Sequence, residues 1–350
     1  MTDPDALPMP THSRAVPLLL GLCAAVLGFA ALSAAQGIIA PVVFALFLIA
    51  IGRPLQRGLE RFLPRLLAVL VTLLACLAVI GVIGSFAIWG FARAGHWLVH
   101  NAALFQGLYL TVAGWLEQHD LYAAGLLAER FNVSWLIRVF QEIGLVLQAL
   151  GSFAVVTFVF VLLGLIEVDD ARSRLATIRH PAAELVMAAG AASARKFQTY
   201  MLVRTLMSAL TGLAVFAFMR LLGLDLAAEW GAIAFALNYI PFIGPLVATV
   251  LPTLFAAAQT GSWEVAVLVL VGLNVIQFLI GSYIEPRFAG ARLAVSPFMV
   301  LFAVFFWAFL WGVPGAFIGV PILIAVVTFC EYSRTGRWVA TLFGARPDPG

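Results

Sequence analysis

Eight long apolar stretches dominate this chain of 350 residues. They cover residues 16–35, 38–52, 66–92, 151–166, 205–222, 230–258, 262–284 and 298–330. A helix that crosses a bilayer needs about 20 consecutive apolar residues. With 63% hydrophobic and 11% charged residues, the chain also has too little polar surface to cover a soluble globule of this length. The sequence therefore predicts an all-α, polytopic membrane protein that has the lipid bilayer as a partner.

Two of these stretches, 230–258 and 298–330, have lengths that fit neither one crossing nor two. Each is interrupted near its middle by prolines and glycines, in "IPFIGP" (240–245) and "WGVPGAFIGVP" (311–321). Proline removes a backbone donor, and glycine tolerates a positive φ, so both strings end helices inside an apolar stretch. We expect Gly244 to need such a positive φ, so that a valine there would distort the chain.

The basic residues indicate how the stretches are oriented. Sixteen of the 20 lie in the N-terminal tail, in 53–65, in 167–204, in 285–297 and after residue 330. By the positive-inside rule these segments and both termini are cytoplasmic, and residues 93–150 lie outside. Each interrupted stretch must then start and end on one side of the membrane. We predict two re-entrant hairpins of opposite orientation, with two proline-kinked crossing helices as the alternative.

The same pattern predicts a division of the chain into five parts. These are a cytoplasmic tail 1–15, scaffold helices 16–166 with an amphipathic outer insertion 93–150, a cytoplasmic linker 167–204, a transport unit 205–330 with hairpins 230–258 and 298–330, and a cytoplasmic tail 331–350. The scaffold is expected to stay fixed within a homo-oligomer while the transport unit moves. A cleaved signal ending at "LSAAQG" (32–37) is the alternative for the first stretch, although the preceding tail is a poor signal-peptide start.

Helices that end at membrane depth point to transport. Broken backbone survives there only where it is buried in protein or lines a watery cavity. Inverted repeats with broken helices are typical of secondary transporters. We therefore expect a gradient-driven transporter, coupled to H⁺ or Na⁺, and the alternative is a non-transporting membrane scaffold. Because no acidic residue lies deep in any stretch, a neutral polar solute is favoured.

Candidate binding residues lie at the two interruptions and on the helix 262–284. Along that helix Asn274, Gln277, Gly281 and Glu285 are spaced by three, four and four residues, which predicts one polar face. Interhelical hydrogen bonding is the alternative for the two amides. The complete candidate set for the solute or ion is Asn238, Tyr239, Pro241, Gly244, Pro245, Asn274, Gln277, Glu285, Pro286, Arg287, Gly312, Pro314, Gly315, Gly319 and Pro321.

Several charged residues receive structural interpretations instead. For Glu285 an ion pair with Arg287 is favoured over a role in proton coupling. Arg204 begins a weaker stripe with Ser208 and Thr211, and we expect its side chain to extend to the cytoplasmic interface.

Motifs for catalysis or cofactors are missing from the sequence. It contains no GxxxxGK[ST], HExxH or GxSxG string. His96 and His100 are four residues apart, but an interfacial helix face explains them better than zinc. The basic residues are scattered rather than gathered in a stripe for nucleic acid. We predict no enzyme, metal or cofactor, and no nucleic-acid partner.

Four strings resemble the autoinducer-2 exporter (AI-2E) family of PerM-like permeases. They are "RKFQTYMLVRTLMSALTG" (195–212), "LLGLDLAAEWGAIAFALNYIPFIGP" (221–245), "IEPRFAGARLAVSPFMVL" (284–301) and "WGVPGAFIGVP", and the resemblance covers about residues 36–332. It implies an oligomeric, elevator-like permease of the bacterial inner membrane that exports small polar metabolites such as autoinducer-2. Other members are described as sodium(lithium)/proton antiporters.

The chain departs from the family pattern at two places. Residues 165–175 read "LIEVDDARSRL", where many relatives carry a Leu-Asp-Gly-like turn. The exporter branch often has asparagine in place of Phe242 and serine in place of Pro245. The resemblance therefore leaves the substrate open.

Overall fold

The computed structural model describes residues 15–118, 133–289 and 295–343. Every regular element among them is a helix, and seven of these helices are long and apolar enough to cross a membrane. This confirms an all-α, polytopic membrane protein. The elements are α1 Ala15–Ala34, α2 Gln36–Leu59, α3 Arg65–His100, α4 Ala102–Gln118, α6 Val133–Thr177, α7 Pro181–Leu221, α8 Ala227–Leu237, α9 Ile243–Thr260, α10 Trp263–Phe278, the π-helix η1 Leu279–Ile284, α11 Glu285–Ala289, α12 Pro297–Tyr332 and α13 Arg337–Leu342.

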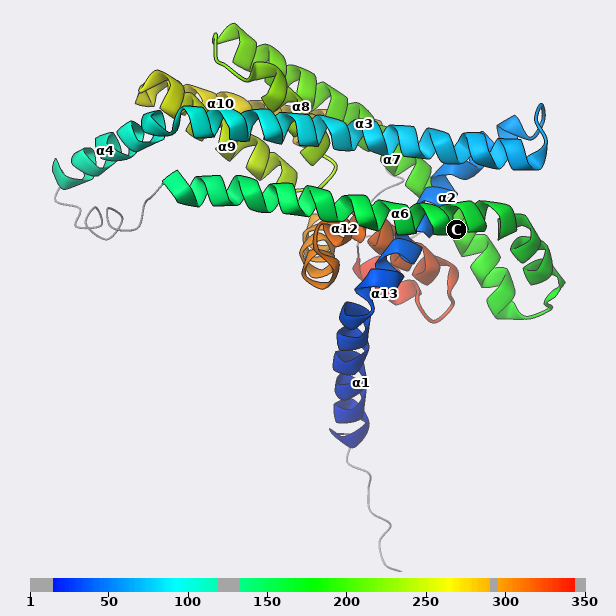
Figure 1. Ribbon diagram of the computed structural model, residues 1–350. Coiled ribbons are helices and arrows are strands. Elements are labelled where there is room, and N and C mark those ends of the chain that lie inside the picture. Colours follow the sequence, from blue (N-terminus) through cyan, green and yellow to red (C-terminus); the bar gives the residue numbers. More distant parts are fainter. Residues whose placement is uncertain (1–14, 119–132, 290–294, 344–350) are drawn as a thin grey trace, which may run out of the picture.

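Three long helices, α3, α6 and α7, form the frame of the molecule. Figure 1 shows α3 and α6 running side by side, and Gly95 of α3 faces the ring of Phe140 on α6. The segment 93–150 is built from the end of α3, from α4 and from the start of α6, so its described residues continue the frame helices. Residues 167–204 are likewise helical, as the end of α6 and the first half of α7.

The first interrupted stretch folds into two antiparallel arms, α8 and α9, here called hairpin 1. The ring of Trp230, near the start of α8, lies 4.9 Å from that of Phe255, near the end of α9. The tip between the arms is a tight turn in which Ile243 N–H donates to the Pro241 carbonyl at 2.7 Å. The residue at its centre, Phe242, has φ 64°. Positive φ therefore falls on Phe242 and not on Gly244, which corrects the sequence-based expectation.

The second interrupted stretch, α12, also folds back on itself and is called hairpin 2. Its helical geometry breaks at Gly312, with φ 65° and ψ −143°, a combination open almost only to glycine. A Cβ placed on Gly315 would meet the Trp307 carbonyl oxygen at 1.9 Å, and one on Gly319 would meet that of Ala303 at 2.8 Å. Residues on either side of Gly312 thus lie opposite one another, so the two arms are antiparallel.

The repeated Phe-Ile-Gly string does not mark equivalent positions in the two hairpins. In hairpin 1 it forms the tip, whereas in hairpin 2 Gly319 lies within the second arm. The equivalent positions are Gly244 and Gly315. A Cβ on Gly244 would lie 1.9 Å from the Leu237 carbonyl oxygen, just as one on Gly315 would lie 1.9 Å from that of Trp307. The two tips are therefore built alike although their sequences align differently.

The hairpins pack against different parts of the frame. Hairpin 1 shares the largest hydrophobic cluster with α3, α4 and α6, through rings that surround Phe255. Hairpin 2 packs on α1, α2 and α7, through Trp311 and Ile318 against Phe47. In Figure 1, most of α1 extends away from the rest of the chain. Helix α7 contacts both hairpins, and this position makes it the centre of the candidate site.

Candidate functional site

One face of α7 carries a row of polar side chains. Tyr200, Arg204, Ser208 and Thr211 are spaced by four, four and three residues, so they lie on one side of the helix. Arg204, Ser208 and Thr211 are buried, Tyr200 is half-buried, and Thr205 next to Arg204 is exposed. We call these five residues the α7 polar face. Polar groups in a membrane helix that turn toward the protein mark a cavity, a pathway or an interhelical contact.

Arg204, which is buried, forms an ion pair with the partly buried Glu285 of α11. Its Nη1 lies 3.0 and 3.1 Å from the two carboxylate oxygens, and the arginine side chain is only 8% exposed. The structure thus corrects one expectation, since Glu285 is paired with Arg204 and not with Arg287. Arg287 instead stacks on the Tyr283 ring, 3.9 Å from its centre. Arg204 can pair because Glu285 follows the π-helix, which changes the face on which later residues lie.

The tip of hairpin 1 is tied to the α7 polar face by two hydrogen bonds. The Asn238 amide donates to Ser208 Oγ at 3.2 Å, in a fully buried contact. The Tyr239 hydroxyl donates to Thr205 Oγ1 at 3.0 Å. These bonds bring two of the sequence-predicted site residues onto α7.

Hairpin 2 closes the other side of the same region. Tyr200 packs against a cluster of its buried residues that includes Val304, Val320 and Ile324. The Tyr239 ring stacks on Phe317 of hairpin 2, with centroids 5.9 Å apart and planes 20° apart. Both hairpins therefore meet at the α7 polar face.

Three buried polar atoms on this face lack a hydrogen-bond partner among the described residues. They are the hydroxyl of Tyr200, Nε of Arg204 and the hydroxyl of Thr211. An unmet buried polar group costs about 1–3 kcal/mol, so such groups are rare unless water or a ligand satisfies them. Their occurrence within three turns of one helix makes this face the strongest candidate for a solute site.

The remaining candidates at the tips have backbone roles. The Pro241 carbonyl accepts the turn bond, and the Pro245 carbonyl accepts a bond from Thr249 Oγ1 at 2.8 Å. At the tip of hairpin 2, Pro314 follows Gly312, and Gly315 is buried. Gly319 and Pro321 lie in the second arm and form part of its packing surface.

The predicted polar face on α10 does not persist. Asn274 is exposed and donates to the Leu270 carbonyl of its own helix at 2.7 Å, while Gln277 is half-buried. Gly281 lies in the π-helix and is exposed, as is Pro286. Because π-helical turns are wider, the α-helical spacing that would join Gly281 and Glu285 to Asn274 and Gln277 no longer holds. Of this set, Glu285 is hydrogen-bonded to α7.

Sequence reasoning missed Tyr200 and Thr205, and it ranked the stripe on α7 below the one on α10. The signal was present, because the spacing of Tyr200, Arg204, Ser208 and Thr211 is as regular as that on α10. Their partners could not be found in this way, since Glu285 is 81 positions from Arg204 and Asn238 is 30 from Ser208.

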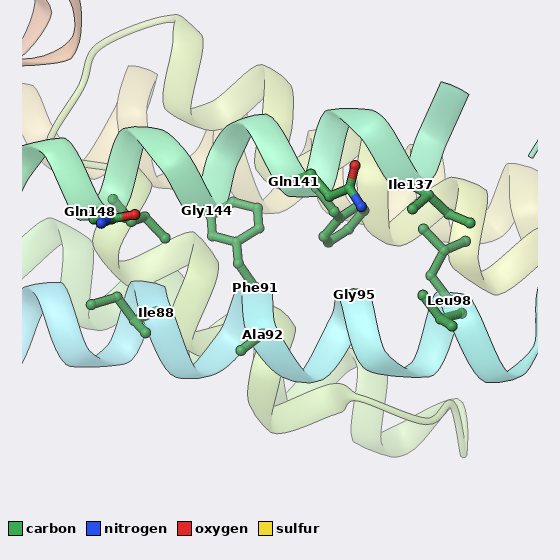
Figure 2. A pocket seen from close by; sticks show the side chains of 12 residues that line it. Ile88, Phe91, Ala92, Gly95, Leu98, Ile137, Gln141, Gly144 and Gln148 are labelled. Carbon is green, nitrogen blue, oxygen red and sulfur yellow. The ribbon is translucent and has the colours of Figure 1, made fainter. Parts of the chain in front are cut away.

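An apolar groove lies elsewhere, between α3 and α6. Figure 2 shows it lined by residues such as Phe91, Gly95, Ile137 and Gly144, with Gln141 and Gln148 at its edge. Its volume is about 460 Å³, and none of its lining residues belongs to the α7 polar face. Among the described residues, no three His, Cys, Asp or Glu side chains come together as a metal site.

Comparison with known sequences places the chain among transport proteins. A sequence model described as AI-2E family transporter matches residues 19–335. AI-2 transport protein TqsA of Escherichia coli is 36% identical over 143 residues, which are 41% of each chain. A putative transport protein of Borreliella burgdorferi is 35% identical over 128 residues, 36% of this chain and 35% of the relative.

A longer alignment joins the chain to a putative transport protein of Haemophilus influenzae. The two are 26% identical over 339 residues, which are 93% of this chain and 95% of the relative. The first two relatives, by contrast, are matched over about two fifths of their length or less.

Proposed function

Because this chain belongs to the AI-2E transporter family, whose members are multi-pass membrane transporters, we propose that it is a secondary transporter that exports a small, polar, autoinducer-2-like solute. The observation that carries the proposal is the α7 polar face, on which both hairpins meet and three buried polar atoms have no hydrogen-bond partner among the described residues. Broken helices that meet at a buried polar site are the arrangement expected of a secondary transporter.

The chemistry of the face favours a neutral solute. Arg204 and Glu285 neutralise each other, and the other groups are hydroxyls and the Asn238 amide. Hydroxyl and carbonyl groups of a small solute could satisfy Tyr200, Arg204 Nε and Thr211 together. A bare ion would lack a counter-charge there as long as the ion pair stays closed.

We further propose that transport follows an elevator-like, alternating-access cycle in a homo-oligomer of the bacterial inner membrane, with both termini cytoplasmic. In that cycle residues 16–166 form the fixed scaffold and residues 205–330 the moving unit, while the tails 1–15 and 331–350 lie outside both. The cytoplasmic linker 167–204 leads into the moving unit, so Tyr200 and Arg204 lie at the cytoplasmic end of the site. Arg93 of α3 and Glu229 of α8, 3.2 Å apart, lie across the boundary between these two parts. Movement along that boundary separates the pair.

Sodium(lithium)/proton antiport is the second candidate function, because of the Arg204–Glu285 pair. A proton on Glu285 would remove its charge and release Arg204, which offers a route to coupling with H⁺ or Na⁺. A third possibility, a membrane scaffold that does not transport, would need the packing of this region but not its polar atoms.

Flux through liposomes tests the proposal. Purified protein is reconstituted, and efflux of autoinducer-2 and of small polyols is measured with and without Na⁺ or pH gradients. We expect saturable efflux of a neutral polar solute that Thr211→Val reduces. Thr111→Val, at an exposed threonine of α4 that bonds only its own helix, is the matched control. Cation–proton exchange without solute efflux would favour the second function, and no flux of either kind would favour the scaffold.

A further inference from the structure

Lys196 and Glu331 join α7 to the last turn of hairpin 2. Lys196 Nζ donates to Glu331 Oε2 at 2.7 Å, and the side chains are 26% and 32% exposed. Lys196 lies one helical turn before Tyr200 and two turns before Arg204, on the same side of α7. At 1.5 Å per residue it is therefore about 6 Å from the level of Tyr200 and about 12 Å from that of Arg204.

The second arm of hairpin 2 runs from the candidate site to this ion pair. Val320 and Ile324 on that arm are buried in the cluster that packs against Tyr200 and Phe197 of α7. Glu331 stands at the end of the same arm, two turns beyond Ile324. Access to the Tyr200 hydroxyl along this arm requires the arm to leave α7, and this movement must break the bond between Lys196 and Glu331.

The two ion pairs of α7 differ in how readily they can open. Arg204 is 8% exposed and bonds both carboxylate oxygens of Glu285, which is 26% exposed, whereas Lys196 is 26% exposed and makes one bond to Glu331, which is 32% exposed. Partly exposed pairs stabilise a contact only weakly, while breaking a buried pair is costly. Weak, reversible closure suits a gate, and the pair with the buried arginine suits a fixed element of the site.

We propose that the Lys196–Glu331 pair is the latch of a cytoplasmic gate: it holds the second arm of hairpin 2 on α7, and its opening exposes the α7 polar face to the cytoplasm. The inference rests on the proposed function, because a gate requires a solute to admit. It assigns positioning roles to two residues outside the sequence-predicted site.

The first test measures opening without any transported solute. Val320→Cys is introduced into a full-length variant in which Cys23, Cys76 and Cys330 are replaced by alanine, and its reaction with a membrane-impermeant maleimide is timed in liposomes. Val320 is 5% exposed, so labelling is expected to be slow. Glu331→Gln should speed it about fivefold, the effect of losing a weak pair. The charge exchange Lys196→Glu/Glu331→Lys should restore slow labelling.

A matched control removes an ion pair elsewhere on the same side. Asp170 lies 3.8 Å from Arg65, and both side chains are largely exposed, so Asp170→Asn should leave labelling unchanged. If Glu331→Gln labels no faster than this control, the latch is overturned. Faster labelling that the charge exchange fails to reverse overturns it as well.

The second test separates a gate from a merely structural bridge. In the cysteine-free background, Lys196→Cys/Glu331→Cys is linked by a short bifunctional methanethiosulfonate reagent, and autoinducer-2 efflux is followed. Linking should stop efflux and reduction should restore it, while a monofunctional reagent of the same kind should not stop it. Undiminished efflux through the linked protein overturns the gate. If the wild type shows no efflux at all, the proposed function fails, and the labelling test still decides whether the latch opens.

Discussion

Gly212 of α7 and Gly231 of α8 lie face to face where the two helices cross. A Cβ on either glycine would lie 2.8 Å from the carbonyl oxygen of the other, and both residues are buried. Small residues at such crossings let two backbones approach closely in a membrane, where packing drives helix association. This contact holds hairpin 1 one turn beyond Ser208, the residue that bonds Asn238.

Alanine at Gly231 should therefore separate the two helices. The new Cβ meets backbone, which cannot swing aside as a flexible side chain would, and overpacking of this kind costs about 1–3 kcal/mol. We expect a lower thermal unfolding midpoint in detergent and weaker transport. Gly81→Ala on α3 is the matched control, because nothing lies within 4 Å of its added Cβ. Equal midpoints for the two variants would contradict the close crossing.

The hairpin tips should also not tolerate a methyl group on Gly244 or Gly315, because each glycine touches the backbone of the opposite arm. Gly244→Ala and Gly315→Ala each place Cβ 1.9 Å from a carbonyl oxygen of the opposite arm, so the tip must open. We expect the free energy of unfolding to fall by about 1–3 kcal/mol or more in each case. Gly281→Ala, next to open space, should be tolerated. Thermal unfolding of the three variants checks this, and wild-type stability of Gly244→Ala would rule out the described tip.

Length and composition were sufficient to predict the helical membrane fold and both interrupted stretches. Proline and glycine act through the local backbone. The string "IPFIGP" and the string around Gly312 therefore predict an interruption of the helix without any knowledge of the tertiary contacts. The detailed geometry could not be read in this way. The residue with positive φ in hairpin 1 is Phe242, a bulky side chain that sequence rules exclude from such a conformation.

The candidate site was predicted only in part, because its contacts are not local. Asn238 and Tyr239 were identified from their place beside a break, and the structure brings both to α7. The polar face expected on α10 required a regular α-helix as far as Glu285. The chain instead forms a π-helix at 279–284, so the residues on either side of it do not share that face. No periodicity predicts where a π-helix begins, so the partner of Glu285 had to come from the structure.

Membrane topology provides a prediction that does not depend on the site. If hairpin 1 opens to the outside and hairpin 2 to the cytoplasm, Trp263→Cys should react with an impermeant maleimide from outside the cell, and Thr335→Cys only from the cytoplasm. Both native side chains are exposed. The measurement uses the cysteine-free background in intact cells and in inverted vesicles. Labelling of position 263 only from the cytoplasm would reverse the proposed orientation of hairpin 1.

Arg204 should matter far more than Arg287, although Arg287 is two positions from Glu285 in the sequence and Arg204 is 81 positions away. Arg204→Met leaves Glu285 without its buried partner and should cost about 1.5–3 kcal/mol, together with the loss of transport. Arg204→Lys should restore only part of both, since an ammonium cannot reproduce the planar guanidinium. Arg287→Met removes an exposed contact with Tyr283 and should be mild. Unfolding midpoints and efflux rates for the three variants decide between these expectations.

Substitutions at Asn238 and Asn274 distinguish a role in binding the solute from a role in packing. Asn238→Leu removes the only hydrogen bond described for the buried Ser208 hydroxyl, and an unmet group of this kind costs about 1–3 kcal/mol. Asn274→Leu removes an amide that is exposed and bonds its own helix. A leucine at position 274 is compatible with lipid, so insertion and assembly should be normal.

We therefore expect Asn238→Leu to abolish solute efflux and Asn274→Leu to retain it at close to the wild-type rate. Asn238→Leu/Ser208→Ala removes both partners of the bond, and it should recover stability but not transport, because the site then lacks its polar groups. Efflux, thermal unfolding and detergent-stable assembly are measured together for each variant. Loss of efflux in a well-assembled Asn274→Leu variant would move the solute site from α7 to α10. Recovery of efflux in the double variant would leave Asn238 with a packing role alone.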